Sequence, residues 1–213
     1  SSMRRREGGS AWIITFADLM TLMFCFFVLL TVLSTQPKNC NGLEKFMTEN
    51  AGIFKNYQLR STKLSCIISL PQDFLFRSGD AELKAGAIRV LTPFFKKIRD
   101  LPEHQGDLVI VEGHADNLPI RTDKYPSNWE LSTARATNVA TMLINRMGYP
   151  SGTISVNGYS DTRPKVSYKD SSGNSLRGTA LEAARRTNRR VEIVLTTPPK
   201  SMEEASLLFD GNQ

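Results

Sequence analysis

The sequence predicts a single N-terminal transmembrane helix followed by a domain with an α/β two-layer sandwich fold. The first observation is an apolar run at residues 11–33, which has the length of about 20 residues that crosses a bilayer core. The second is that strand-like and helix-like patterns alternate after residue 62, as in a sheet with helices on one face. The chain has 213 residues, so one span leaves enough chain for one ordinary domain.

Charge sets the expected orientation of the span. The net charge is +6, and Arg4, Arg5 and Arg6 directly precede the apolar run. The positive-inside rule therefore makes residues 1–10 a cytoplasmic tail and puts everything after residue 33 across the membrane. A cleaved signal peptide has a shorter apolar core and small residues at its cleavage site, so we expect a retained anchor.

Asp18 is the one charged residue in the apolar run. A carboxylate inside a bilayer costs about 2.5–3.5 kcal/mol on insertion scales, which marks it as functional. Thr21 and Cys25 share its helix face, and this polar stripe has to face protein or water. Asp18 can then load and release a small cation, which requires partner helices because one helix cannot enclose an ion path. A structural Asp that bonds a neighbouring helix is the alternative.

Residues 34–61 are expected to link the span to the domain. Apolar side chains recur at helical spacing within residues 42–60, and they include Phe46, Met47, Phe54 and Tyr57. We interpret this stretch as a short amphipathic segment beside the membrane. The alternative is a linker with a weak helical bias.

The domain is expected over residues 62–198. Its strands are predicted at residues 64–70, 107–113, 154–159 and 190–196, and its helices at residues 82–100, 127–147 and 181–187. Pro93 indicates a kink or break near Thr92, and Gly148 is expected to end the second helix. Residues 165–179 form a polar loop, and residues 199–213 form a flexible tail.

Cysteine and histidine usage predicts neither a metal site nor an enzyme. Cys40 and Cys66 would lie in an oxidising compartment and could pair, but we favour two unrelated small residues. His104 and His114 are the only histidines, and the sequence His114-x-Asp116 lacks a third ligand. No arrangement of a nucleophile with a base is evident.

The second helix carries a charge on its buried stripe. Ser127 and Glu130 form a capping box at its start, and Arg135 lies on the apolar stripe, where a charge needs a partner. Asp116 follows the second strand in a loop that could lie nearby. An Asp and an Arg in one pocket suit a zwitterion, since they accept an ammonium group and grip a carboxylate. A salt bridge that only ties loop to helix is equally open.

The span resembles that of the flagellar motor stator B subunits, MotB and its sodium-driven relative PomB. The matching residues are Ala11-Trp12, Thr15-Phe16-Ala17-Asp18-Leu19-Met20-Thr21 and Cys25-Phe26-Phe27-Val28-Leu29-Leu30. The resemblance implies that Asp18 binds the transported H⁺ or Na⁺, with Thr21 and Cys25 as neighbours and no other cofactor. It also implies a homodimer inside a pentameric ring of a MotA/PomA-type polytopic subunit in the bacterial inner membrane, which acts on the flagellar rotor. The segment from Cys25 to Phe27 is closer to the sodium-driven branch.

The domain resembles the OmpA-like peptidoglycan-binding domain. The matching blocks are Gly113-His114-Ala115-Asp116-Asn117, Asn128-Trp129-Glu130-Leu131-Ser132-Thr133-Ala134-Arg135-Ala136 and Asn188-Arg189-Arg190-Val191-Glu192. The resemblance implies a periplasmic domain in which Asp116 and Arg135, assisted by Asn128, bind the amino-acid end of diaminopimelate in the peptidoglycan stem peptide.

The stator resemblance also implies that the amphipathic segment is a plug, which blocks ion flow until the stator docks. Phe46, Met47, Phe54 and Tyr57 would form its apolar face. An inert spacer is the alternative.

The sequence thus favours a wall-anchored stator subunit that couples ion flow to torque. The alternatives are another ion-driven envelope machine, for energy transduction or phage defence, and a purely structural peptidoglycan tether. The arginines at positions 185, 186, 189 and 190 could suggest nucleic acid. Because they lie across the membrane without interleaved aromatic residues, we expect no nucleic-acid partner.

Overall fold

The computed structural model describes residues 11–34, 38–54 and 57–198. The chain divides into two compact units, residues 1–37 and residues 38–213. The expected cytoplasmic tail, residues 1–10, and the expected C-terminal tail, residues 199–213, lie outside the described residues.

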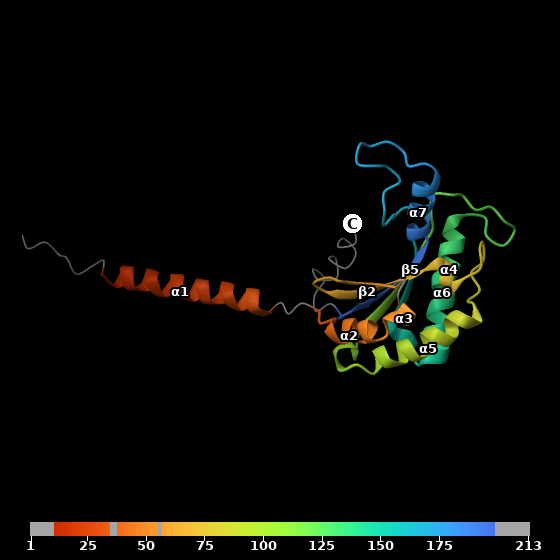
Figure 1. The fold of residues 1–213 in the computed structure, drawn as a ribbon. Helices are drawn as coiled ribbons and strands as arrows, with labels where there is room; N and C mark the ends of the chain where they lie inside the picture. The colour runs from red at the N-terminus through yellow and green to blue at the C-terminus, as the bar shows by residue number, and fades with distance from the viewer. Residues whose placement is uncertain (1–10, 35–37, 55–56, 199–213) are drawn as a thin grey trace, which may run out of the picture. The chain divides into compact units, whose positions relative to one another are not determined.

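The first unit is one continuous helix, α1 (Ala11–Ser34), drawn in red in Figure 1. Its 24 residues correspond to a length of roughly 36 Å at 1.5 Å per residue, which suffices for a hydrocarbon core of about 30 Å. Within the described part of the chain, Trp12–Thr31 is the one helix long and apolar enough to cross a membrane. Its large side chains, such as Trp12 and Phe24, are exposed in the isolated chain, as expected for a surface that meets lipid or other helices.

The second unit is built on a five-stranded sheet with the order β1-β2-β5-β3-β4. Strands β3 and β4 are parallel, and the other neighbours are antiparallel. The strands are β1 (Gln58–Ser61), β2 (Ser65–Pro71), β3 (Leu108–His114), β4 (Ile154–Gly158) and β5 (Arg190–Thr196).

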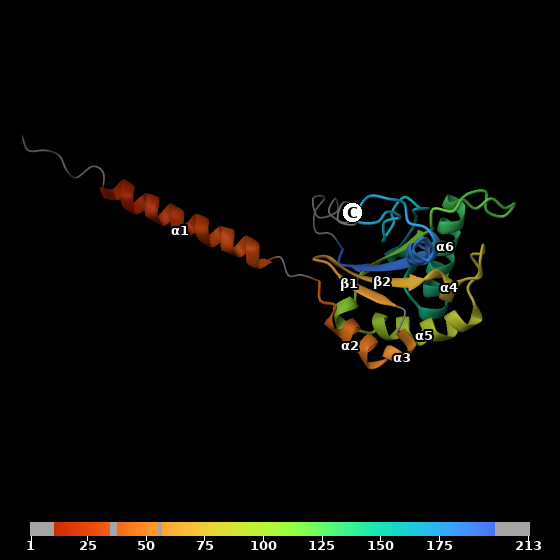
Figure 2. The same ribbon diagram turned by 45° about the horizontal axis from the view of Figure 1, so that its top comes forward.

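Helices cover one face of this sheet, which confirms the predicted fold class (Figures 1 and 2). The α-helices of this unit are α2 (Asn41–Glu49), α3 (Ala51–Phe54), α4 (Gln72–Leu75), α5 (Ala85–Arg99), α6 (Asn128–Met147) and α7 (Gly178–Asn188), with short 3₁₀ turns at Pro102–His104 and Ser151–Thr153. In both views the long loop between β4 and α7 lies on the other side of the sheet from α5. Helix α5 continues through Pro93, so the break considered near Thr92 does not occur.

The core lies between the sheet and helices α5 and α6. Alternate residues of β3 and β5 face the helices, as the two-residue period of a strand requires. Each fully buried apolar side chain contributes roughly 1.5–3 kcal/mol. The buried cluster includes Val109, Val111, Val191, Ile193 and Leu195 from the strands and Leu91, Phe95, Ile98, Val139 and Leu143 from the helices.

Gly113 sets how closely α6 approaches the end of β3. A Cβ atom at Gly113 would lie 2.0 Å from the carbonyl oxygen of Ser132, a distance that no side chain tolerates. The missing side chain therefore lets the first turns of α6 press against the end of β3. This contact brings the loop that carries Asp116 beside the start of α6.

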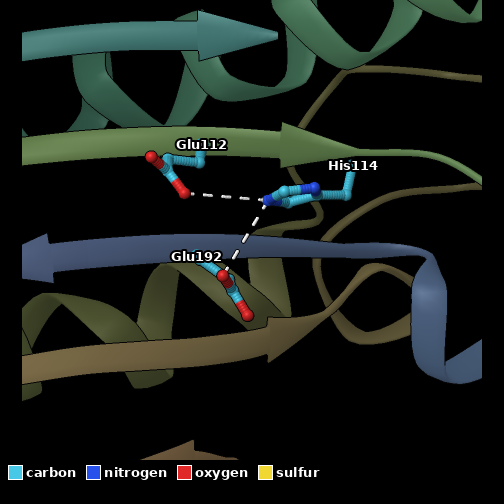
Figure 3. A group of neighbouring side chains, drawn as sticks. All are labelled: Glu112, His114 and Glu192. Carbon is cyan, nitrogen blue, oxygen red and sulfur yellow. Dashed lines mark ion pairs between the residues drawn. The ribbon is translucent and has the colours of Figure 1, made fainter. Parts of the chain in front are cut away.

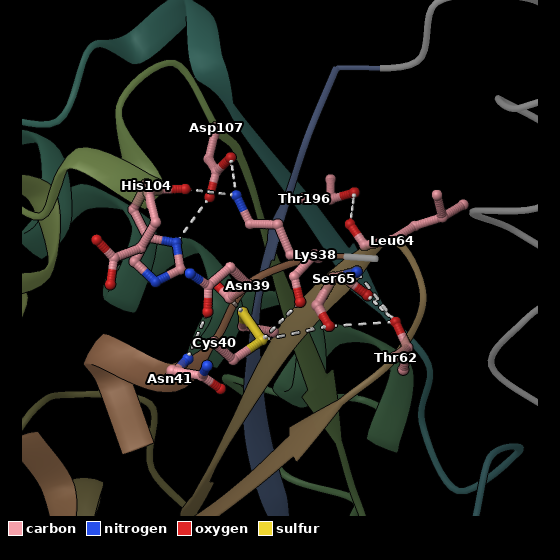
Figure 4. The surroundings of a disulfide bond; sticks show 12 residues. Lys38, Asn39, Cys40, Asn41, Thr62, Leu64, Ser65, His104, Asp107 and Thr196 are labelled. Carbon is pink, nitrogen blue, oxygen red and sulfur yellow. Dashed lines mark hydrogen bonds and ion pairs between the residues drawn. A yellow bond between two sulfur atoms is a disulfide. The ribbon is translucent and has the colours of Figure 1, made fainter. Parts of the chain in front are cut away.

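A disulfide joins Cys40 to Cys66, with a Cα–Cα distance of 5.8 Å (Figure 4). The favoured expectation of two unrelated cysteines was therefore wrong. The two residues are 26 positions apart, and only the fold brings them together: the amide of Lys38 bonds the carbonyl of Lys63 at 2.9 Å, beside the start of β2. The Lys38 ammonium also pairs with the buried Asp107 carboxylate.

The amphipathic segment is docked on the domain. Phe46 stacks on Phe94 of α5 at 5.8 Å between ring centroids, and Phe54 lies 4.5 Å from the same ring. Tyr57 contacts Phe74 at 5.4 Å. An apolar helical face suits a protein core as well as a membrane surface, and in this structure the domain covers that face. The compact unit accordingly begins at Lys38, before the expected boundary at residue 62.

Candidate functional site

The membrane unit presents Asp18 on a narrow polar face of α1. Thr21 and Cys25 lie three and seven positions further on, and all three side chains are exposed in the isolated chain. The Thr21 hydroxyl donates to the carbonyl of Ala17 at 2.8 Å, so its oxygen keeps lone pairs that can accept. This helix therefore offers a cation the Asp18 carboxylate and threonine hydroxyl oxygens, and further ligands would have to come from outside it.

The second unit has a cavity of about 380 Å³ between α4, α6, α7 and the loop after β3. Asp116, Asn128 and Arg135, which the sequence singled out, all line it. The structure therefore brings the three expected binding residues together. The other lining residues include Gln72, Asp73, Ser78, Gly79, Ala115, Leu118, Glu182 and Arg189.

Arg135 is the buried cation of this cavity, with 3 % of its surface exposed. It lies on the inner face of α6 beside Leu131, as its sequence position indicated. Its Nε donates to the carbonyl of Asp80 at 2.8 Å, and its Nη1 donates to the side-chain oxygen of Gln72. Burial lowers its pKa to about 10, so the guanidinium remains charged at neutral pH.

The remaining nitrogen of Arg135, Nη2, has no hydrogen-bond partner among the described residues. An unsatisfied buried donor is costly, and a donor on a charged group that lines a cavity is suited to a ligand oxygen. Because the other two donors hold the guanidinium plane in place, Nη2 is positioned to donate a hydrogen bond to one oxygen of a carboxylate.

Asp116 pairs with Arg189 rather than with Arg135. Its Oδ2 lies 2.7 Å from Nη1 of Arg189, and its Oδ1 accepts from the amide of Leu118 at 2.9 Å. Nη2 of Arg189 also binds Glu182 at 3.1 Å. Burial opposes the charge of Arg189, but the hydrogen bonds that it donates to Asp116 and Glu182 raise its pKa. The alternative of an Asp116–Arg135 salt bridge that ties loop to helix was therefore wrong.

Asn128 shapes the loop that holds Asp116. Its side-chain amide donates to the carbonyls of Asp116 at 3.2 Å and Leu118 at 2.9 Å, and its side-chain oxygen accepts from the amide of Ile120. Ser127 caps the N-terminus of α6, and this cap fixes the position of Asn128, the first residue of the helix. Asn128 therefore supports the loop rather than projecting a free group into the cavity.

Arg189 is a cavity residue to which the sequence analysis assigned no binding role, since the arginine run was considered only as a possible nucleic-acid signal. Strand pairing contained a signal: β3 and β5 are antiparallel with His114 opposite Arg190. That register places the residue before β5 beside the loop after β3, where Asp116 stands. The cavity lining consequently contains the guanidinium groups of Arg135 and Arg189, and the Asp116 carboxylate there is already paired with Arg189.

Two family models match parts of the chain. Residues 2–43 match a model described as membrane MotB of the proton-channel complex MotA/MotB, and residues 75–177 match the OmpA family. The first match contains Asp18, and the second contains Asp116, Asn128 and Arg135.

Individual relatives agree with this division. The uncharacterized protein YtxE of Bacillus subtilis is 28% identical over an alignment of 236 positions, gaps included, that covers 91% of each chain. Motility protein B of the same organism is 28% identical over 72% of this chain and 53% of its own length.

Solved structures share the fold of the second unit. The cell wall anchor of the T6SS from Pseudomonas aeruginosa matches 76% of this chain and 99% of its own, with a TM-score of 0.57 and 26% identity. The periplasmic domain of Helicobacter pylori MotB matches 74% of this chain and 89% of its own, with a TM-score of 0.57 and 22% identity. The chain is therefore similar to MotB in its membrane segment, and the domain that follows is OmpA-like.

Proposed function

We propose that this chain is a wall-anchored stator subunit of an ion-driven bacterial flagellar motor. A cation passes Asp18 on its way through the membrane, and the OmpA-family domain holds the unit to peptidoglycan. The observation that carries the proposal is a lone carboxylic acid inside a span that matches a MotB model. Placing a carboxylate inside a membrane costs free energy, and a protein that acts only as a tether gains nothing from it.

The ion path requires partners. One helix cannot surround an ion, so the span has to pack against a MotA/PomA-type polytopic subunit, with two copies of this chain inside a ring of five. Moving one charge across 100 mV releases about 2.3 kcal/mol, which is enough to drive a conformational step when Asp18 is neutralised and released.

The wall ligand is the amino-acid end of diaminopimelate in the stem peptide. Its carboxylate binds Nη2 of Arg135, a buried donor with no partner in the described ranges of the chain, and its ammonium binds the Asp116 carboxylate, which is also paired with Arg189. Both groups line one cavity, and a carboxylate oxygen can accept more than one hydrogen bond.

The decisive experiment replaces Asp18 with Asn in the natural host and measures the rotation of tethered cells. We expect Asp18→Asn to abolish torque while leaving membrane insertion and peptidoglycan binding intact. Thr31→Val is the matched control on the same helix, since the Thr31 hydroxyl bonds the carbonyl of Phe27, and it should rotate normally. Full torque in the Asn variant would overturn the proposal.

A second measurement distinguishes the two candidate ions, H⁺ and Na⁺. In it, motor speed is followed as the sodium concentration is varied at fixed membrane potential. The Cys25-Phe26-Phe27 segment is more similar to the sodium-driven branch of the stator family, while the description of the matching family model names a proton channel. A speed that rises with sodium assigns Na⁺, and a speed that follows only pH assigns H⁺.

A structural wall tether is the second candidate, and the likeness to a T6SS cell wall anchor favours it. A tether would bind peptidoglycan through the same cavity and be indifferent to Asp18→Asn. An ion-driven machine other than the flagellar motor would lose its activity with that variant but leave swimming unchanged.

We also propose that residues 42–60 act as a plug. In the docked arrangement Phe46 and Phe54 contact Phe94, so plug activity would require these rings to leave the domain. The apolar face that the core now covers would then be free to bind elsewhere.

A further inference from the structure

A second polar cluster lies on the sheet face opposite the helices. Glu112 and His114 are two residues apart on β3, so they share a face, and Glu192 lies opposite Glu112 on β5. Figure 3 shows the two carboxylates reaching toward one ring nitrogen of His114 from two strands. The cluster lines a cavity of about 730 Å³ that is also bounded by Arg60, Thr162, Arg163, Pro164, Lys165 and Arg190.

The three side chains converge on one point. Nε2 of His114 lies 3.8 Å from Oε2 of Glu112 and 3.9 Å from Oε2 of Glu192, and all three ligand atoms lie within 4.8 Å of one another. Donor atoms around a tetrahedral Zn²⁺ ion are about 3.4 Å apart, since each lies about 2.0–2.2 Å from the metal. Small rotamer adjustments would therefore bring these atoms to a metal.

His114 is a buried histidine whose ring has no hydrogen-bond partner among the described residues. It is 3 % exposed, and neither of its ring nitrogens has a hydrogen-bond partner in the described part of the chain. Burial is the largest influence on the ring and lowers its pKa, which favours the neutral imidazole that binds metals. Leaving such a nitrogen dry and unbonded is unfavourable.

The outer carboxylate oxygens are already held by neighbours. Oε1 of Glu192 accepts from Nε of Arg190 at 2.8 Å and lies 3.9 Å from the Lys165 ammonium. Oε1 of Glu112 lies 3.4 Å from the Tyr159 hydroxyl. In both glutamates the Oε2 atom faces His114, and hydrogen bonds to the outer oxygen are how proteins orient metal-binding carboxylates.

We propose that Glu112, His114 and Glu192 bind one divalent transition-metal ion of the Zn²⁺ type, with water from the cavity completing the shell. One nitrogen and two carboxylate oxygens suit such an ion. The role of the ion would be structural, because it would link β3 to β5. The link lies next to Arg189 and next to the loop that carries Asp116. It is distinct from the wall cavity and from the membrane carboxylate.

The test titrates ZnCl₂ into the untagged full chain in detergent after chelator treatment, with isothermal calorimetry as the readout. We expect one ion per chain. His114→Phe keeps the ring against Tyr159, which lies 5.3 Å away, and should lower the affinity by more than about tenfold; His114→Gln should do the same. Mg²⁺ should not compete, since it prefers an all-oxygen shell.

His104→Gln is the matched control, because His104 is the other buried histidine and already bonds Asp107 at 2.9 Å. It should leave zinc affinity unchanged. X-ray absorption of the zinc-loaded wild-type chain gives a check without substitutions and should show imidazole nitrogen with oxygen ligands. The proposal is overturned if the wild-type chain binds no zinc, if both His114 variants bind as well as the parent, or if the metal shell contains no imidazole. A cluster that only forms ion pairs with a protonated His114 would give the first of these results.

Discussion

The carboxylate of Asp116 lies 2.7 Å from Nη1 of Arg189, while Arg135 lines the same cavity and its Nη2 bonds none of the residues that the structure describes. The two arginines are therefore not equivalent. Arg189 pairs with the Asp116 carboxylate in the absence of ligand, whereas Nη2 of Arg135 remains available to donate to a ligand. This difference predicts which arginine a ligand carboxylate depends on.

Arg135→Lys should weaken peptidoglycan binding at least tenfold while the domain stays folded. Lysine keeps the charge but loses the planar fork that bonds Asp80, Gln72 and a ligand together. Co-sedimentation of the full chain with purified peptidoglycan measures the effect. Arg186→Lys is the control, since its side chain is 72% exposed; binding of the Arg135 variant equal to that of the control would exclude Arg135 from the site.

Replacing both Cys40 and Cys66 with Ser should destabilise the second unit by about 3 kcal/mol. The disulfide closes a loop across 26 positions, and a loop of that size removes roughly this much chain entropy from the unfolded state. Urea unfolding followed by fluorescence in detergent gives the free energy. Cys25→Ser, which changes the free cysteine of α1, should leave the unfolding midpoint unchanged.

Phe54→Ala should loosen the docked segment. Phe54 is 6 % exposed and contacts Phe46, Tyr57 and Phe94, so truncation costs roughly 3–5 kcal/mol. Hydrogen exchange of residues 41–54 should become faster, while exchange in β3 and β5 should change little. Ile53→Ala is a close control because Ile53 is 56 % exposed; equal exchange in the two variants would show that the segment is not held by its aromatic face.

Stability of the metal-free domain should fall as the pH drops from about 7.5 to 5.5. Unfolded histidine takes up a proton near pH 6.5, whereas folded His114 resists it: burial and, after it, Arg190 lower its pKa, although Glu112 and Glu192 oppose them. The unfolded state then binds more protons, so acid favours unfolding. Urea midpoints measured across this range with a chelator present test the effect.

The control for this pH dependence is His114→Phe, which removes the titrating group. Its urea midpoint should change less between the same two pH values than that of the parent chain. An identical slope in the two proteins would assign the pH dependence to other groups.

The regular elements were predictable because their patterns are local. The two-residue period of β5 and the capped, glycine-terminated helix α6 are contained in short stretches of sequence. The cavity residues Asp116 and Arg135 were found from their local sequence positions. Arg135 is a charged residue on the apolar stripe of a helix, and Asp116 directly follows the end of a strand. Strand β1 was missed because Gln58–Ser61 carries no apolar alternation, and only its pairing with β2 makes it a strand.

What could not be predicted depends on contacts distant in the chain. Cys40 meets Cys66, and Arg189 meets Asp116 across 73 positions. Glu192 joins Glu112 and His114 only because of the antiparallel register of β3 and β5. In each case the residue type is ordinary, and the partner follows from the fold rather than from spacing along the chain.

The bond between Cys40 and Cys66 also decides where mechanical tension would travel. Once a pull along the backbone from the membrane side has passed the non-covalent contacts of Lys38, it reaches Cys40 and crosses the disulfide into β2, an interior strand. The intervening helices α2 and α3 and strand β1 would be bypassed and would carry none of the load. A covalent shortcut of this kind would let an anchor bear force without peeling, and would leave the docked aromatic segment free to respond to signals other than tension.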